Sequence, residues 1–252
     1  PIGVSNHRWK AAAYRRKIQN GKVFSYAIVM FTGIVVFVSL IFFNWDQVLN
    51  SFPILSSIII LPLFGALISM LIKGSEKDVS KNVRDLALWI SIVELGLVTL
   101  LCYQFDLSNS DFQNIEKKTL LSKFGISYFL GVDSLSLVFV LLTSLLFPIC
   151  IYYTKLSIRF RSKEFMVCFL ALEALVMGVF SCLDIVLFYV FFESLLIPMF
   201  LIIGIWGGKR RIFASYKFFL YTLAGSVFFL ISIIVMASVA NTTSIVELDN
   251  YY

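Results

Sequence analysis

Long apolar runs alternate with short polar connections along most of this chain. A helix needs about 20 apolar residues to cross roughly 30 Å of hydrocarbon, and seven segments have approximately this length. They lie at residues 24–43, 52–72, 86–105, 133–153, 165–182, 184–206 and 213–240. A membrane β-barrel would instead show segments of about ten residues with alternating polarity. The pattern therefore predicts an all-α, polytopic membrane protein with seven transmembrane helices.

The composition agrees with a membrane protein and argues against several kinds of cofactor site. Of the 252 residues, 60% are hydrophobic and 14% are charged, and the mean hydropathy is +0.91, well above that of soluble domains. The four cysteines have no CxxC spacing, so we interpret them as small buried hydrophobic residues. The single histidine, His7, excludes a His-rich metal or haem site. No glycine-rich nucleotide motif is present, so any redox cofactor is expected on another chain.

Charged residues are divided unequally between the two sides of the membrane. If the helices alternate in direction, one side carries the connections 1–23, 73–85, 154–164 and 207–217, with 18 Lys/Arg and four acidic residues. The opposite side carries three Lys and eight acidic residues. The positive-inside rule places the basic side in the cytoplasm or the mitochondrial matrix. The net charge of +6 follows from this asymmetry together with three acidic residues inside the membrane, so no nucleic-acid partner is expected.

The polar ends and the longest loop are assigned by composition. Residues 1–22 carry six Lys/Arg and no acidic residue, which fits either an organellar targeting segment or an anchor that holds the N-terminus inside. Residues 1–23 are interpreted as a basic segment on the inner, matrix side, and residues 241–252 as an outer-side tail. The connection 106–131 is expected to contain a short amphipathic piece at the outer surface.

Three acidic residues lie within the apolar segments: Glu94, Glu173 and Glu193. At 1.5 Å per residue, Glu173 and Glu193 both lie roughly 14 to 16 Å below the turn at Asp184 and can face each other. A charge at the bilayer centre costs about 2.5 to 3.5 kcal/mol, so such residues normally face a partner, water or the bundle interior. We predict that these carboxyl groups exchange protons. The alternative is that each stays protonated and hydrogen-bonded to a neighbouring helix.

Two further residues bear on proton transfer. Pro198 leaves the carbonyl of Ser194 without its usual donor and bends the helix just after Glu193, and polar groups freed at a bend need water or side chains. Lys217 lies roughly 9 Å deep, from which it either reaches inward or extends back to the surface. The candidate proton-translocating residues are therefore Glu193, Glu173 and Lys217. No metal or cofactor is expected on this chain.

Three blocks of the sequence resemble a known family. The stretch LDIVLFYVFFESLLIPMFLIIGIWGGKRRIFASYKFFLYTLAGSVFFL, residues 183–230, closely resembles the central part of NADH dehydrogenase subunit 4, an antiporter-like subunit of respiratory complex I. Residues 52–68 and 128–151 resemble the first and third helices of that subunit. The resemblance implies that residues 52–240 form the first six helices of an antiporter-like, proton-translocating fold, preceded by an additional transmembrane helix at 24–43.

The resemblance also implies roles and partners. Glu193 takes the place of the family's proton-channel carboxylate, in the block FFE, and Glu173 that of a second Glu on the preceding helix. Family members move protons outward while NADH reduces ubiquinone elsewhere in the complex. FMN, iron–sulfur clusters and ubiquinone are accordingly expected on other subunits, and other complex I membrane subunits are expected as partners. The implied location is the mitochondrial inner membrane, with a bacterial inner membrane as the alternative.

The sequence also departs from the family. Members continue through a second, inverted repeat that carries the lysines of the proton path and an HxWLPxAH block, neither of which appears here. We therefore expect a divided subunit whose C-terminal half is supplied by a second chain, or else a sequence that continues further. Glu94 has no family counterpart that we can place.

Other interpretations stay open at this point. One is a subunit of a multi-subunit cation/proton antiporter, which shares the carboxylate but performs no quinone chemistry. Another is a structural membrane subunit in which Glu193 no longer titrates. A seven-helix receptor is disfavoured, because its N-terminus would normally lie outside. The basic cluster 209–211 is interpreted either as a site for cardiolipin-type lipid headgroups or as solvated positive-inside charge.

Overall fold

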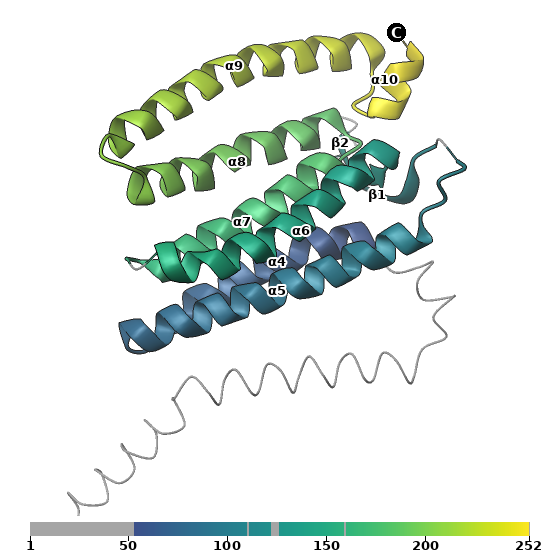
Figure 1. Cartoon of the computed structure of the whole chain (residues 1–252). Coiled ribbons are helices and arrows are strands. Elements are labelled where there is room, and N and C mark those ends of the chain that lie inside the picture. The colour runs from purple at the N-terminus through teal and green to yellow at the C-terminus, as the bar shows by residue number, and fades with distance from the viewer. Residues whose placement is uncertain (1–52, 110, 122–125, 159, 252) are drawn as a thin grey trace, which may run out of the picture.

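The computed structural model describes residues 53–109, 111–121, 126–158 and 160–251. Within these ranges, six helices are long and apolar enough to cross a membrane. They are α4 (Ile54–Leu71), α5 (Glu76–Gln104), α6 (Ser134–Ser157), α7 (Ser162–Ser181), α8 (Ile185–Trp206) and α9 (Arg211–Ala240). Figure 1 shows them lying side by side along one common direction. This confirms the polytopic helical fold, while the predicted segments 1–23 and 24–43 lie outside the described residues.

The helix bounds agree with the apolar runs except at the start of α5. That helix begins at Glu76, ten residues before the predicted span. Ser75 caps it by accepting a hydrogen bond from the backbone N–H of Asp78 (3.4 Å), and Glu76 and Asp78 lie in the first turn, where negative charge is favoured by the helix dipole. The segment 76–85 is thus a charged extension of a membrane helix, which apolar content alone does not reveal.

A β-hairpin occupies the long outer connection, where the sequence predicted only a short amphipathic piece. Strand β1 (Gln113–Leu121) pairs antiparallel with β2 (Ile126–Val132). The apolar run of β2 packs against helix ends, and its Leu130 and Val132 are fully buried. Glu116 of β1 accepts hydrogen bonds from the backbone N–H groups of Leu55 (2.8 Å) and Ser56 (3.1 Å). The hairpin therefore satisfies the free N–H groups at the start of α4.

Asp184 joins three segments at the outer surface, and we call this arrangement the Asp184 junction. Its carboxylate caps α8 by accepting from the backbone N–H groups of Val186 and Leu187, both at 3.0 Å. It also accepts from the N–H of Ser127 in β2 (3.1 Å) and from the hydroxyl of Thr243 after α9 (2.6 Å). A fully buried carboxylate with this many donors is well satisfied. The short helix α10 (Ile245–Tyr251) follows directly.

Burial differs strongly among the helices. In α4 and α7, 44% of the membrane-spanning window is buried, against 11% in α8 and in α9. Figure 1 accordingly shows α8 and α9 on one side of the group formed by α4 to α7. Close contact between α7 and α8 depends on Gly178, because an added Cβ there would lie 2.8 Å from the ring of Phe191. The chain thus has a packed core and a largely uncovered apolar face, which we call the α8–α9 face.

Candidate functional site

The three acidic residues predicted inside the membrane lie on three different helices. Glu94 is on α5, Glu173 on α7 and Glu193 on α8. Glu94 and Glu173 are both fully buried, and Glu193 is half-buried. The Oε2 atom of Glu193 is buried and has no hydrogen-bond partner among the described residues. All three helices therefore place a carboxyl group away from bulk water in the membrane interior.

Glu173 makes its hydrogen bond with α5. The hydroxyl of Ser91 donates to Oε2 of Glu173 at 2.7 Å, and the carboxyl group of Glu94 interacts with that of Glu173 from the same helix. The residue count places Glu193 at the same depth on α8, so that Glu173 can face it. Within the described residues, however, the partners of Glu173 are Ser91 and Glu94.

Sequence reasoning did not find the grouping of Glu94 with Ser91 and Glu173. A signal was present, because Ser91 and Glu94 are three residues apart and so share one face of a helix. The buried residues of α5 follow the same face: Val83, Leu86, Ala87, Ser91, Glu94, Val98 and Leu101. A serine and a glutamate in an otherwise apolar stripe point to a polar partner on the helix opposite.

Helix α8 carries a polar backbone group next to Glu193. Pro198 lies within the helix and has no N–H to donate to the carbonyl of Ser194. The hydroxyl of Ser194 bonds instead to the carbonyl of Val190 at 2.6 Å, so it does not compensate for the missing donor. Residues 193 and 194 therefore offer two adjacent acceptors that water or a partner side chain can fill.

Lys217 lies on an exposed side of α9, near the inner end of that helix. The ion pair found in the described part of the chain is at the outer surface and joins Lys117 to Glu247 at 4.0 Å. Glu193 thus has no ion-pair partner among the described residues. The predicted part of Lys217 in proton transfer stays a prediction.

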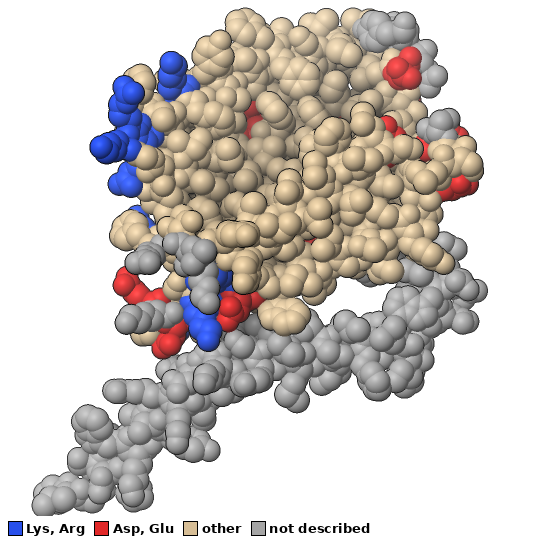
Figure 2. Space-filling model, viewed as in Figure 1, with Lys and Arg blue, Asp and Glu red and all other residues tan. Residues whose placement is uncertain are grey.

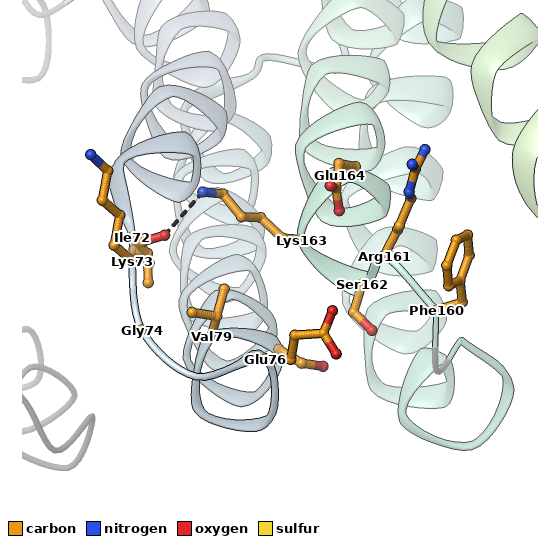
Figure 3. Close-up of a pocket in the computed structure, with 11 residues that line it drawn as sticks. Ile72, Lys73, Gly74, Glu76, Val79, Phe160, Arg161, Ser162, Lys163 and Glu164 are labelled. Atoms are coloured by element: carbon orange, nitrogen blue, oxygen red, sulfur yellow. Dashed lines mark hydrogen bonds between the residues drawn. The ribbon is translucent and has the colours of Figure 1, made fainter.

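A pocket of about 360 Å³ opens at the inner ends of the helices (Figure 3). Its lining includes Lys73, Glu76, Arg161 and Glu164, so both charge signs are present. The Lys163 side chain also lines the pocket, but its Nζ already donates hydrogen bonds to the carbonyls of Met70 (2.7 Å) and Ile72 (2.9 Å). These bonds cap the end of α4. We interpret the pocket as part of the positively charged membrane surface rather than as a reaction site.

The distribution of charge on the surface matches the predicted orientation. Figure 2 shows Lys and Arg gathered at the end of the bundle where α8 turns into α9, which holds the sequence Lys209, Arg210, Arg211. The opposite end carries the Asp184 junction and the hairpin. By the positive-inside rule, the first end faces the cytoplasm or matrix.

Comparison with known proteins identifies relatives over most of the chain. A family profile described as "NADH:quinone oxidoreductase/Mrp antiporter, TM" matches residues 182–252. NADH-quinone oxidoreductase subunit M of Rhodobacter capsulatus is 45% identical over 199 residues, which cover 79% of this chain and 38% of the relative. NADH-ubiquinone oxidoreductase chain 4 of Arabidopsis thaliana is 42% identical over 192 residues, which cover 76% of this chain and 38% of the relative.

Comparison with solved structures also finds chains of similar fold. A chain of respiratory complex I from Thermus thermophilus with bound NADH superposes with a TM-score of 0.65 at 25% identity, covering 77% of this chain and 38% of that one. A chain of the Mrp complex from Dietzia sp. DQ12-45-1b has the same TM-score at 18% identity, with 77% and 20% covered, which shows a common fold.

These matches confirm the resemblance to NADH dehydrogenase subunit 4. The chain spans less than half the length of the relatives it matches, 38% in both the bacterial and the plant protein. The bacterial and plant relatives have similar identities to this chain, 45% and 42%. Both matches support a multi-pass membrane protein.

Proposed function

We propose that this chain is a proton-translocating membrane-arm subunit of an NADH:ubiquinone oxidoreductase, respiratory complex I. The observation that carries the proposal is Glu193, which lies midway along α8 with a buried and unpartnered Oε2 atom, inside the region matched by the family profile. A buried carboxyl group with an open hydrogen-bond position is suited to bind and release a proton.

Protonation determines whether Glu193 is neutral or charged, and the surroundings set the balance. Desolvation favours the neutral acid, and an approaching cation favours the carboxylate. A cation that moves toward and away from Glu193 would therefore make it release and take up a proton. Glu173 lies at the same depth on the adjacent helix, and Lys217 is the basic residue of α9 closest to the membrane interior. These three residues form the proposed proton path on this chain.

We infer that the α8–α9 face is covered by further helices of the complex. Its spans are mostly unburied in the isolated chain, and the half-buried Glu193 has no cation within the described residues. A second helical unit that supplies a lysine would provide both the packing and the charge. In the assembled complex, this lysine is expected within hydrogen-bond reach of Glu193, directly or through one water. An assembled complex with no basic residue at this place would contradict the inference.

On this proposal the chain contributes to NADH:ubiquinone reductase activity without carrying a redox centre. FMN, the iron–sulfur clusters and ubiquinone are held by other subunits. The proposed location is the mitochondrial inner membrane with the basic end in the matrix, and a bacterial inner membrane accommodates the same orientation. We also propose that the cluster Lys209, Arg210 and Arg211 contacts anionic headgroups such as that of cardiolipin.

The replacement Glu193→Gln tests the function. Proton translocation driven by NADH oxidation should fall by about tenfold or more, because a neutral amide cannot exchange the proton. Glu164→Gln is the matched control, since Glu164 is an exposed residue at the inner end of α7. An unchanged ratio of protons moved per electron in Glu193→Gln would overturn the proposal and favour a purely structural subunit.

A cation/proton antiporter subunit is the second candidate, because the matched profile names both kinds of protein and the Mrp chain has the same fold. The two candidates differ in what drives transport. Proton movement that requires NADH and quinone supports the oxidoreductase. Sodium–proton exchange by the complex in sealed vesicles, without either substrate, supports the antiporter.

A further inference from the structure

The space between α5 and α7 contains a buried polar cluster of which the proposed function uses only Glu173. Its members are Ser91, Glu94 and Glu173, and all three are fully buried. One hydrogen bond is formed, from the hydroxyl of Ser91 to Oε2 of Glu173 at 2.7 Å. Both carboxyl oxygens of Glu94, and Oε1 of Glu173, lack hydrogen-bond partners within the described residues. Glu94 is thus a buried acid that forms no hydrogen bond among the described residues and lies beside Glu173 on the helix opposite.

Two ionised carboxylates are not stable in this position. Each would lose its hydration, and the two negative charges would repel each other. A basic residue nearby would relieve the repulsion, but the helices packed around the cluster do not offer one at this depth. Away from the cluster, these helices carry Glu76, Lys77, Asp78, Lys81, Arg84 and Asp85 on α5, Lys163 and Glu164 on α7, and Lys155 near the inner end of α6, and the charged residue at a comparable depth is the acid Glu193 on α8. Helix α4 carries no charged residue.

A single proton resolves the arrangement. When one of the two carboxyl groups is protonated, its O–H donates to the other, which is the pattern of acid pairs that share one proton. The hydroxyl of Ser91 then supplies a second donor to the same anion. The cluster then retains one negative charge, which two hydrogen bonds stabilise. With both carboxyl groups ionised, it would hold two negative charges and only the hydrogen bond from Ser91. Neither acid alone can form this arrangement, so the pair titrates as a unit.

We propose that Glu94 and Glu173 form a shared proton-binding site, and that Glu94 is an additional proton-carrying residue of this chain. Its part in translocation rests on the proposed function, in which Glu193 is the exchanging group. The site holds one proton between the two carboxyl groups and can take up a second when a proton arrives from the hydrated side. It acts as a store from which Glu193 is supplied.

The geometry places the store next to Glu193. Glu173 lies eight residues before Ser181, the end of α7, and Glu193 lies eight residues after Ile185, the start of α8. At 1.5 Å per residue, both therefore lie about 12 Å below the turn that joins these antiparallel helices. Gly178 permits close contact of α7 with Phe191, two residues before Glu193. The shared site and Glu193 therefore lie on two helices, α7 and α8, that are in direct contact.

Infrared spectroscopy of the assembled complex, with Glu94→Gln and Glu173→Gln introduced separately, tests the site. A protonated carboxyl group has a C=O band that a carboxylate lacks, and hydrogen/deuterium exchange shifts it. The wild type should show one such band, and each variant should lack it in the difference spectrum. Each variant should also bind one titrating proton fewer per complex than the wild type. Because the glutamine amide can donate to the remaining carboxylate, Glu94→Gln is expected to assemble normally. Glu76→Gln, an exposed acid on the same helix, is the control and should leave the band intact.

Proton translocation by the same variants separates this proposal from the proposed function. If Glu193→Gln abolishes translocation while Glu94→Gln leaves both the band and translocation unchanged, the shared site is overturned and the proposed function stands. If Glu94→Gln removes the band while Glu193→Gln has no effect on translocation, proton binding by the pair stands and the proposed function fails. A band that disappears on adding sodium at constant pH would identify the cluster as a cation site and overturn the proposal. A slower translocation rate in Glu94→Gln, with Glu76→Gln unaffected, is the expected result.

Discussion

Ser91 on α5 and Glu173 on α7 are joined by a hydrogen bond of 2.7 Å from the serine hydroxyl to Oε2, and both side chains are fully buried. In the membrane interior this bond connects α5 and α7, whose other contacts, apart from that of Glu94 with Glu173, are largely apolar. It fixes the Glu173 carboxyl group at one rotation of α7 and directs it toward α5. The bond therefore positions an acid as well as stabilising a helix pair.

Ser91→Ala removes the donor and leaves Oε2 of Glu173 buried without it. The free energy of unfolding should fall by about 1 to 3 kcal/mol, the penalty of an orphaned buried acceptor. Thermal inactivation of the assembled complex measures the change. Ser232→Ala is the control, because that exposed hydroxyl bonds to the carbonyl of Phe228 in its own helix. Equal losses in the two variants would contradict the assigned role of Ser91.

Gly178→Ala should push α7 and α8 apart. The added Cβ would lie 2.8 Å from the ring of Phe191, and inserting a methyl group into a packed contact typically costs about 1 to 3 kcal/mol. Gly96→Ala, on α5, is the matched control, since no atom lies within 4 Å of its added Cβ. That variant should be neutral or more stable by up to about 1 kcal/mol, because alanine favours helix. Thermal stability of both variants gives the comparison.

Asp184→Ala should open the Asp184 junction. The substitution removes the cap of α8 and the acceptor for Ser127 and Thr243, and a loss of about 3 kcal/mol or more is expected. Asp184→Asn keeps one acceptor oxygen and should lose less. Proteolysis of the outer loops together with thermal inactivation measures the effect. Stability equal to that of Asp249→Ala, an exposed acid on α10, would argue against the junction.

Asp133 gives the outer end of α6 a pH-dependent stability. Partial burial acts to raise the pKa of Asp133, but hydrogen bonds from the hydroxyl and backbone N–H of Ser136, with further backbone groups, outweigh it and leave the pKa below its usual value. A pKa lowered by folding means that the stabilisation is present above the unfolded pKa, about 3.9, and is lost as the pH falls through the folded value. Thermal stability of the wild type should therefore exceed that of Asp133→Asn near neutral pH, and the difference should shrink below about pH 4. A difference that grows on acidification would show the opposite sign.

The sequence predicted the membrane spans well, because a bilayer demands apolar residues over a fixed length. Five of the described helices begin and end within a few residues of their apolar runs. The start of α5 was missed, since the cap at Ser75 and the acidic first turn extend that helix through polar sequence. The hairpin was missed because β2 is buried from Phe129 to Val132 and lies close to the start of α6, so the regular alternation that marks a half-exposed strand does not extend along it.

The sequence predicts that the acids lie inside the membrane, but it does not identify Ser91 and Glu94 as the partners of Glu173. Equal depth on neighbouring helices shows only that Glu173 and Glu193 can face each other. Depth follows from counting residues, but facing depends on the rotation of each helix about its axis, which packing decides. Here the rotation of α7 brings Glu173 to α5, where Ser91 and Glu94 lie on the buried stripe. Glu94 therefore becomes significant only once the two helices are placed together.

The Asp184 junction also sets an order of events during biosynthesis. A chain is made from its N-terminus, so Ser127 and the start of α8 are available to this carboxylate long before Thr243, 59 positions later, has followed α9 through the bilayer. Until that last donor arrives, a nascent chain presents an incompletely satisfied acid at the outer face. The hydrogen bonds of Asp184 are therefore completed only after the sixth described span has entered the bilayer.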